Sequence, residues 1–228
     1  MNPSAAAAMP DPTLVDLLAG NAARRGNRAA VIVDDRVHTH AMLHEAVRRQ
    51  AAALVALGVR PGDRIVLLAG NRAEVLVLLG AAGWIGAMLV PLNLRLSAAE
   101  LAQQAQDAAP ALVVLDPACD TAWRAAFPQG MPEVPVAGLA AADGPSLAIA
   151  GPTGAAPAPR ADAPELAVLM LYTAAVDGRA RGAVLSQANL LASAGQIARA
   201  WSLDADDRWL GVLPLFHAAG IGLALTLL

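Results

Sequence analysis

Apolar residues recur along this chain in two patterns, and their alternation predicts the order of helices and strands. Between residues 41 and 57 they recur every three or four positions, which is the spacing of an amphipathic helix. Residues 64–69 (RIVLLA) form instead a continuous apolar run, which is typical of a strand buried on both faces of a sheet. The two patterns together predict an α/β fold.

The remaining segments extend this alternation over the chain. We expect further helices over residues 14–25, from about 73, and over 98–108 and 189–201. We expect further strands at 29–33, 37–39, 87–90, 111–115, 166–172, 183–185 and 209–213. Most connections are long enough for crossovers, so the pattern predicts mostly parallel sheets flanked by helices.

The composition changes in the middle of the chain. Residues 116–164 are rich in Ala, Pro and Gly and have weak periodicity, although Trp123 and Phe127 fit one helical face. The Pro-interrupted end of this stretch predicts a linker. The expected organisation is a disordered leader at 1–12, a first α/β portion at 13–150, a linker at 151–164, and a second α/β portion at 165–228.

Charge and cysteine content exclude several classes of function. The net charge is -3, and no basic patch indicates a nucleic-acid partner. Cys119 is the single cysteine, so neither an intrachain disulfide nor a cysteine-built metal site is possible. The four histidines lack HExxH spacing, and we expect no metal ligands in the protein.

One uncharged segment, residues 75–92, is long enough to be considered as a membrane span. It contains three glycines and a proline, and these favour a buried helix that turns into a buried strand. We therefore expect no integral membrane segment and a cytoplasmic location.

The segment from Leu171 to Leu190 carries the candidate chemistry. Its pattern predicts a strand, a small glycine-containing basic loop, a second strand and a helix. Small residues allow a backbone to approach phosphate oxygens, and Arg179 and Arg181 add positive charge. From these residues alone, an anion-binding loop and a solvated basic hairpin remain equally plausible.

Residues 172–190 resemble the signature of the adenylate-forming (AMP-binding) superfamily, whose pattern is roughly YTSGTTGxPKGAVLSHxNL. The superfamily includes acyl-CoA synthetases, peptide-synthetase adenylation domains and luciferases. The positions that agree are Tyr172, Thr173, Gly178, Gly182, Ala183, Val184, Leu185, Ser186 and Asn189. The positions that differ are Ala174, Ala175, Val176, Asp177, Ala180, Arg181 and Gln187.

Three further segments resemble the same family in the same order. They are LGVRPGDRIVLLAGN at 57–71, GAMLVPLNLRLSAAEL at 86–101 and LPLFHAAG at 213–220. Together with the loop, these segments cover nearly the whole chain from about residue 13. The resemblance implies the N-terminal domain of an AMP-forming acyl-CoA synthetase.

The resemblance also implies a reaction and a site. A carboxylic acid attacks the α-phosphate of ATP with Mg²⁺, pyrophosphate leaves, and coenzyme A then displaces AMP. The loop would hold the β- and γ-phosphates, through Thr173, Ala174, Ala175, Val176, Asp177, Gly178, Arg179, Arg181 and Gly182. His217 would be the catalytic residue, beside the acyl and pantetheine groups.

Asp177 is the most consequential departure from the family pattern. It places a carboxylate where the family has a neutral hydroxyl facing phosphate. At ~4 Å and an effective dielectric constant of ~20, one such repulsion costs about 4 kcal/mol. Since Arg181 retains the cationic charge of the family lysine, the expectation is weakened or reorganised ATP binding.

The family segments expected after LPLFHAAG do not occur in this sequence. We therefore expect a truncated enzyme that is inactive alone and exposes apolar surface, which would favour a homo-oligomer. Two alternatives stay open. One is a non-catalytic homologue that acts as a binding module, and the other is an adenylation module of a peptide synthetase.

Overall fold

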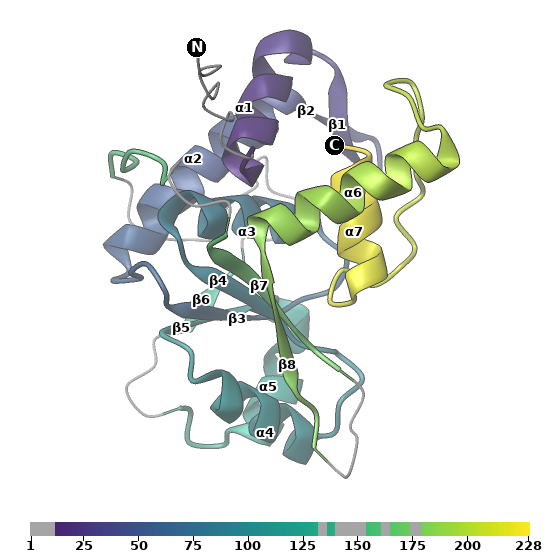
Figure 1. Cartoon of the computed structure of the whole chain (residues 1–228). Coiled ribbons are helices and arrows are strands. Elements are labelled where there is room, and N and C mark those ends of the chain that lie inside the picture. The colour runs from purple at the N-terminus through teal and green to yellow at the C-terminus, as the bar shows by residue number, and fades with distance from the viewer. Residues whose placement is uncertain (1–11, 132–135, 140–153, 161–164, 174–178) are drawn as a thin grey trace, which may run out of the picture.

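The computed structural model describes residues 12–131, 136–139, 154–160, 165–173 and 179–228 (Figure 1). Its centre is a six-stranded sheet in the order β6-β5-β3-β4-β7-β8. The strands are β3 (Arg64–Leu68), β4 (Met88–Pro91), β5 (Leu112–Leu115), β6 (Val136–Gly138), β7 (Ala167–Tyr172) and β8 (Gly182–Ser186). Only the β7–β8 pair is antiparallel among these described strands, which confirms the prediction of a mostly parallel sheet.

Helices cover both faces of this sheet, as Figure 1 shows. The helices are α1 (Leu14–Arg25), α2 (His40–Ala56), α3 (Ala73–Ile85), α4 (Ala98–Ala108), α5 (Asp120–Ala126), α6 (Gln187–Trp201) and α7 (Ala218–Thr226), with a 3-10 turn at Pro117–Cys119. On one face, α4 and α5 pack on the sheet. On the other face lie α1, α2 and α3, joined by α6 and α7.

The continuous apolar strands divide their side chains between the two faces. In β3, Ile65 and Leu67 belong to the core with α1–α3, whereas Val66 and Leu68 belong to the core with α4 and α5. This alternation follows from the two-residue period of a strand. A strand with a core on both sides must be apolar throughout, so the prediction from residues 64–69 is confirmed.

Helix α3 lies at the centre of the larger core and is apolar on all sides. Gly86 ends it in the left-handed conformation with φ 74°, and the chain continues directly into β4. The segment considered as a membrane span is therefore the predicted buried helix followed by a buried strand. No helix in the described ranges is long and apolar enough to cross a membrane.

A local sequence signal correctly indicates the start of α4. Ser97 begins α4 with the predicted capping box, in which its hydroxyl accepts from the Glu100 amide at 3.3 Å. The predicted face of Trp123 and Phe127 is also present. Their ring centroids lie 4.5 Å apart, and both side chains are buried under the sheet.

The structure differs from the predicted strands at two places. The predicted strand at 209–213 is wrong, because the described chain provides no neighbouring strand there and a side-chain amide binds its backbone instead. Conversely, β6 was not expected, because three residues are too few to show periodicity. It pairs with β5 at the sheet edge.

Strands from both sides of the expected linker share the central sheet, since Leu89 of β4 pairs with Leu169 of β7. Part of the linker itself contacts α3. The Arg160 amide donates to the Trp84 carbonyl at 2.9 Å, and the Trp84 indole donates to the Pro157 carbonyl at 2.9 Å. A separate hairpin of β1 (Ala29–Val33) and β2 (Arg36–Thr39) lies beside α2.

Gly80 marks the tightest approach of α3 to its neighbours. A Cβ atom at this position would lie 2.8 Å from Val47 Cγ2 and 2.9 Å from Leu18 Cδ1. We predict that Gly80→Val lowers the free energy of unfolding by about 1–3 kcal/mol through overpacking. Gly138→Val is the matched control, because a Cβ there meets nothing within 4 Å. Urea unfolding measures both, and equal stabilities of the two variants would contradict the packing account.

Candidate functional site

A cavity of about 320 Å³ lies at the carboxyl ends of β4 and β7. Ligands of open α/β sheets bind at this edge, because loops leave the strands there. Its walls combine three stretches that are far apart in the sequence. The lining residues are Pro91, Asn93, Leu96, Glu100, Gln103, Gln104, Tyr172, Thr173, Ala180, Phe216 and His217.

Thr173 closes the base of the candidate phosphate loop. Its amide donates to the Arg181 carbonyl at 3.0 Å, and its hydroxyl donates to the same oxygen at 3.3 Å. These two bonds bring the beginning and end of the loop together at the cavity wall. The predicted residues Ala174, Ala175, Val176, Asp177 and Gly178 lie outside the described residues.

His217 reaches the same cavity from the start of α7. Its amide donates to the Pro214 carbonyl at 3.1 Å, and its own carbonyl accepts from the Ile221 amide at 3.1 Å. The imidazole is exposed and packs edge-on against Phe216, with ring centroids 4.6 Å apart. The structure thus brings together Thr173 and His217, two residues that were predicted separately from different segments.

Tyr172 joins the loop to α4. Its hydroxyl donates to the Asp107 carboxylate at 2.7 Å, and it lies 3.0 Å from the Gln104 carbonyl. Burial, and after it the hydrogen bond and negative charge of Asp107, raise the pKa of the Tyr172 phenol well above its ordinary value. The phenol therefore stays protonated at neutral pH and anchors the end of β7.

The other predicted loop residues have different positions. Arg179 and Arg181 are exposed, and neither is among the described residues that line the cavity. Gly182 lies against Met170, whose sulfur would be 2.6 Å from a Cβ at this position. None of these three residues lines the cavity, whereas the neighbouring Ala180 does.

One departure from the family pattern has a structural explanation. Gln187, which replaces the family histidine, is fully buried, and its side-chain oxygen accepts from the Leu14 amide at 2.9 Å. It therefore ties the start of α6 to the start of α1, away from the cavity.

The sequence pattern did not indicate several polar residues of the cavity wall, namely Asn93, Glu100, Gln103 and Gln104. The position of Asn93 could have been found from the sequence, because it lies two residues after the end of a buried parallel strand. The two glutamines lie on α4, whose apolar spacing predicts a helix but does not indicate what its other side faces.

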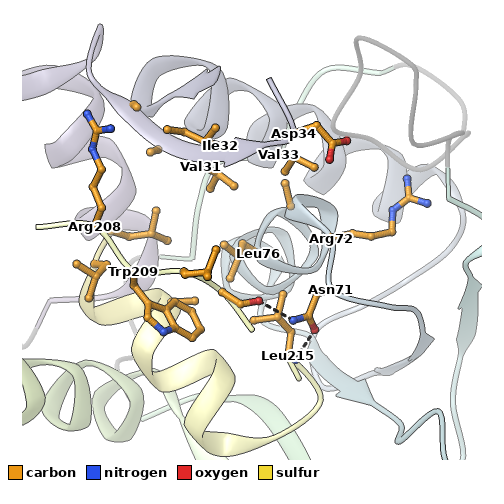
Figure 2. A pocket seen from close by; sticks show the side chains of 18 of the residues that line it. Val31, Ile32, Val33, Asp34, Asn71, Arg72, Leu76, Arg208, Trp209 and Leu215 are labelled. Atoms are coloured by element: carbon orange, nitrogen blue, oxygen red, sulfur yellow. Dashed lines mark hydrogen bonds between the residues drawn. The ribbon is translucent and has the colours of Figure 1, made fainter. Parts of the chain in front are cut away.

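A second cavity, of about 400 Å³, lies between the β1–β2 hairpin, the start of α3 and residues 207–215 (Figure 2). Apolar side chains, including Ile32, Leu76 and Trp209, form much of its wall. It contains none of the described residues that the sequence singled out for chemistry. We therefore place the candidate site in the smaller cavity.

The chain belongs to the AMP-binding enzyme family, because the model of that family matches residues 18–228. Among curated proteins, it is 34% identical over 191 residues to a feruloyl-CoA synthase of Amycolatopsis, covering 81% of this chain and 35% of that protein. It is 30% identical over 197 residues to a 2-succinylbenzoate–CoA ligase of Bacillus cereus, covering 86% and 38%. The chain thus spans little more than a third of these relatives.

Two solved structures share the fold of this chain. The ATP-bound MatB of Rhodopseudomonas palustris superposes with a TM-score of 0.79 at 26% identity, over 94% of this chain and 42% of that one. The o-succinylbenzoate CoA synthetase of Bacillus subtilis, in complex with an acyl-adenylate intermediate, gives a TM-score of 0.77 at 27% identity, over 95% and 53%. These likenesses confirm the predicted family and fold class.

The anchor at Tyr172 can be tested by removing one oxygen atom. We predict that Tyr172→Phe lowers the free energy of unfolding by about 1 kcal/mol, because the ring still packs while the hydrogen bond to Asp107 is lost. Asp107→Asn keeps an acceptor and should cost less. Denaturant unfolding of both variants measures the difference, and an unchanged Tyr172→Phe protein would show that the phenol contributes nothing.

Proposed function

We propose that this chain is the N-terminal portion of an AMP-forming acid–CoA ligase, with its adenylation site in the 320 Å³ cavity. The observation that carries the proposal is that Thr173 and His217 line one cavity at the carboxyl edge of the sheet. Membership of the AMP-binding enzyme family supports the choice of chemistry. The acid, ATP and coenzyme A are the proposed small-molecule partners.

In the first step, a carboxylate oxygen attacks the α-phosphorus of ATP, and the bond to the β,γ-pyrophosphate breaks. The departing pyrophosphate gains negative charge, which fixed donors and cations stabilise. We assign that task to the loop from Thr173 to Gly182. Its closed base holds Thr173 at the wall, where the hydroxyl would turn from the Arg181 carbonyl to a phosphate oxygen, while Arg179 and Arg181 contribute positive charge to the same loop.

We assign the part of the site that holds the acid, opposite the phosphate loop, to His217. It stands at the beginning of α7, where unpaired amides and the helix dipole favour a negative group. The acid carboxylate, and later the acyl carbonyl attacked by the coenzyme A thiol, would lie beside its imidazole. Phe216 packs edge-on against that ring.

Mg²⁺ would enter with the nucleotide. The described part of the chain contains no cluster of three His, Cys, Asp or Glu side chains that would hold a metal alone. Mg²⁺ binds commonly through phosphate oxygens, water and one or two carboxylates. This donor set is compatible with the site, and the ion would neutralise phosphate charge there.

A binding module without catalysis is the second candidate function. The substitutions at residues 174–177 favour it, because they replace hydroxyl donors by apolar side chains and a carboxylate. Acid-dependent ATP–pyrophosphate exchange separates the candidates, measured on the full-length polypeptide that the source organism encodes. Exchange with at least one acid of a broad panel supports the ligase, and folded protein without exchange supports the binding module.

The charge of Asp177 makes a specific prediction. Asp177→Thr should tighten ATP–Mg²⁺ binding by about tenfold or more, because it removes a carboxylate from the phosphate loop. Calorimetric titration measures the dissociation constant, and the gain should shrink at high salt. Asp35→Thr, in the exposed turn of the β1–β2 hairpin, is the charge-matched control. Equal ATP affinity of the two variants would show that Asp177 does not repel phosphate.

A further inference from the structure

We infer that Asn71 is a positioning residue for His217, because its side-chain amide holds the chain segment that leads into α7. The inference deepens the proposed function and depends on it for its catalytic consequence. Asn71 itself lies in the turn between β3 and α3 and lines the larger cavity, so it acts on His217 through the backbone.

The amide of Asn71 makes three hydrogen bonds to one stretch of backbone, and Figure 2 draws the one to Leu215. Its Nδ2 group donates to the carbonyl oxygens of Gly211 and Leu213, each at 2.9 Å. Its Oδ1 atom accepts from the Leu215 amide at 3.0 Å. Both donor hydrogens and one acceptor site are thus used on alternate residues, as a neighbouring strand would use them.

Arg28 binds the backbone of Ala205 and the side chain of Asp206, but the part of the segment between Trp209 and Leu215 has few contacts that hold it in place. Residues 203–217 belong to no helix or strand, and Leu210 and Val212 are 80% and 68% exposed. Leu215 is the buried apolar side chain of the segment, with Trp209 packed partly against the same core. Because burial supplies little restraint between these two residues, the Asn71 amide is the main interaction that fixes the backbone there.

Movement of this backbone passes directly to His217. His217 follows Leu215 after a single intervening residue, and its amide donates to the Pro214 carbonyl. Gly220 lies against that same carbonyl so closely that a Cβ would stand 2.2 Å from the oxygen. The first turn of α7 therefore packs against the backbone that Asn71 binds.

Buried ion pairs hold the chain beside Asn71. Arg72, the next residue, pairs with Glu74 at 2.7 Å and with Asp116 at 3.4 Å, and all three side chains are only 10–12% exposed. This cluster joins the carboxyl ends of β3 and β5 to the start of α3. Asn71 therefore connects the ion-paired end of the sheet to a segment that forms no strand pairing of its own.

An asparagine suits this position because its side-chain amide can both donate and accept hydrogen bonds. Alanine would lose all three bonds. Aspartate keeps an acceptor for the Leu215 amide but sets a carboxylate oxygen against two carbonyl oxygens. Asn71→Asp is nearly isosteric, so it tests the two donated bonds without a cavity, and it serves as the second variant if Asn71→Ala unfolds.

The first experiment needs no activity. In Asn71→Ala and Asn71→Asp, nuclear magnetic resonance should show displaced or broadened imidazole signals of His217, assigned with His217→Gln. The signals of His38, His40 and His44 should stay in place. In Asn71→Ala the Leu215 amide should exchange at least about tenfold faster, because it loses its acceptor. Asn189→Ala is the matched control, since it removes one asparagine–backbone bond at the start of α6.

The second experiment measures catalysis in the full-length protein. Both Asn71 variants should lower kcat for thioester formation by about 10–100-fold, because small misplacements of a catalytic group are costly. The KM for ATP should stay within about twofold, since Thr173 holds its loop independently. Asn189→Ala should retain kcat.

The two arms separate failure of this inference from failure of the proposed function. Unchanged His217 signals and Leu215 exchange in both folded Asn71 variants would overturn the positioning role. A parallel loss of kcat and stability in Asn189→Ala would also overturn it, because the effect would then be general. Wild-type protein without ligase activity would refute the proposed function, while the resonance experiment would still decide the role of Asn71.

Discussion

The parallel pairing of β3, β4 and β7 is the constraint on which the rest of this structure depends. Leu67 of β3 stands opposite Pro91 of β4, and Leu89 of β4 stands opposite Leu169 of β7. With this register, all three strands end at one edge of the sheet. The residues that follow them therefore meet there, although they are far apart in the sequence.

Burial explains why that register is kept. The side chains of β3 and β4 alternate between two cores, so a slip of one residue would exchange the apolar contacts on both faces. Helix α3 fills one of these cores and turns at Gly86 straight into β4. The cavity thus lies at the end of a buried strand, whereas Thr173 and His217 on its wall are exposed.

The regular elements could be predicted because their signals are local. Continuous apolar runs indicated strands with two buried faces, and Ser97 with Glu100 indicated a helix start. The segment at 209–213 was wrong for the opposite reason. Its apolar pattern suits a strand, but pairing depends on a partner, and here the partner is the side chain of Asn71. Likewise, the burial of Gln187 against Leu14 follows from the fold alone.

In the proposed function, the cavity lined by Thr173 and His217 receives the nucleotide of an adenylate-forming ligase. The most direct measurement is a crystal structure of the full-length protein with ATP and Mg²⁺. We expect triphosphate density within hydrogen-bonding distance of the Thr173 hydroxyl, with the α-phosphate on the side of His217. Nucleotide bound instead in the apolar cavity beside Ile32 and Trp209, or none bound by folded protein at saturating ATP, would contradict it.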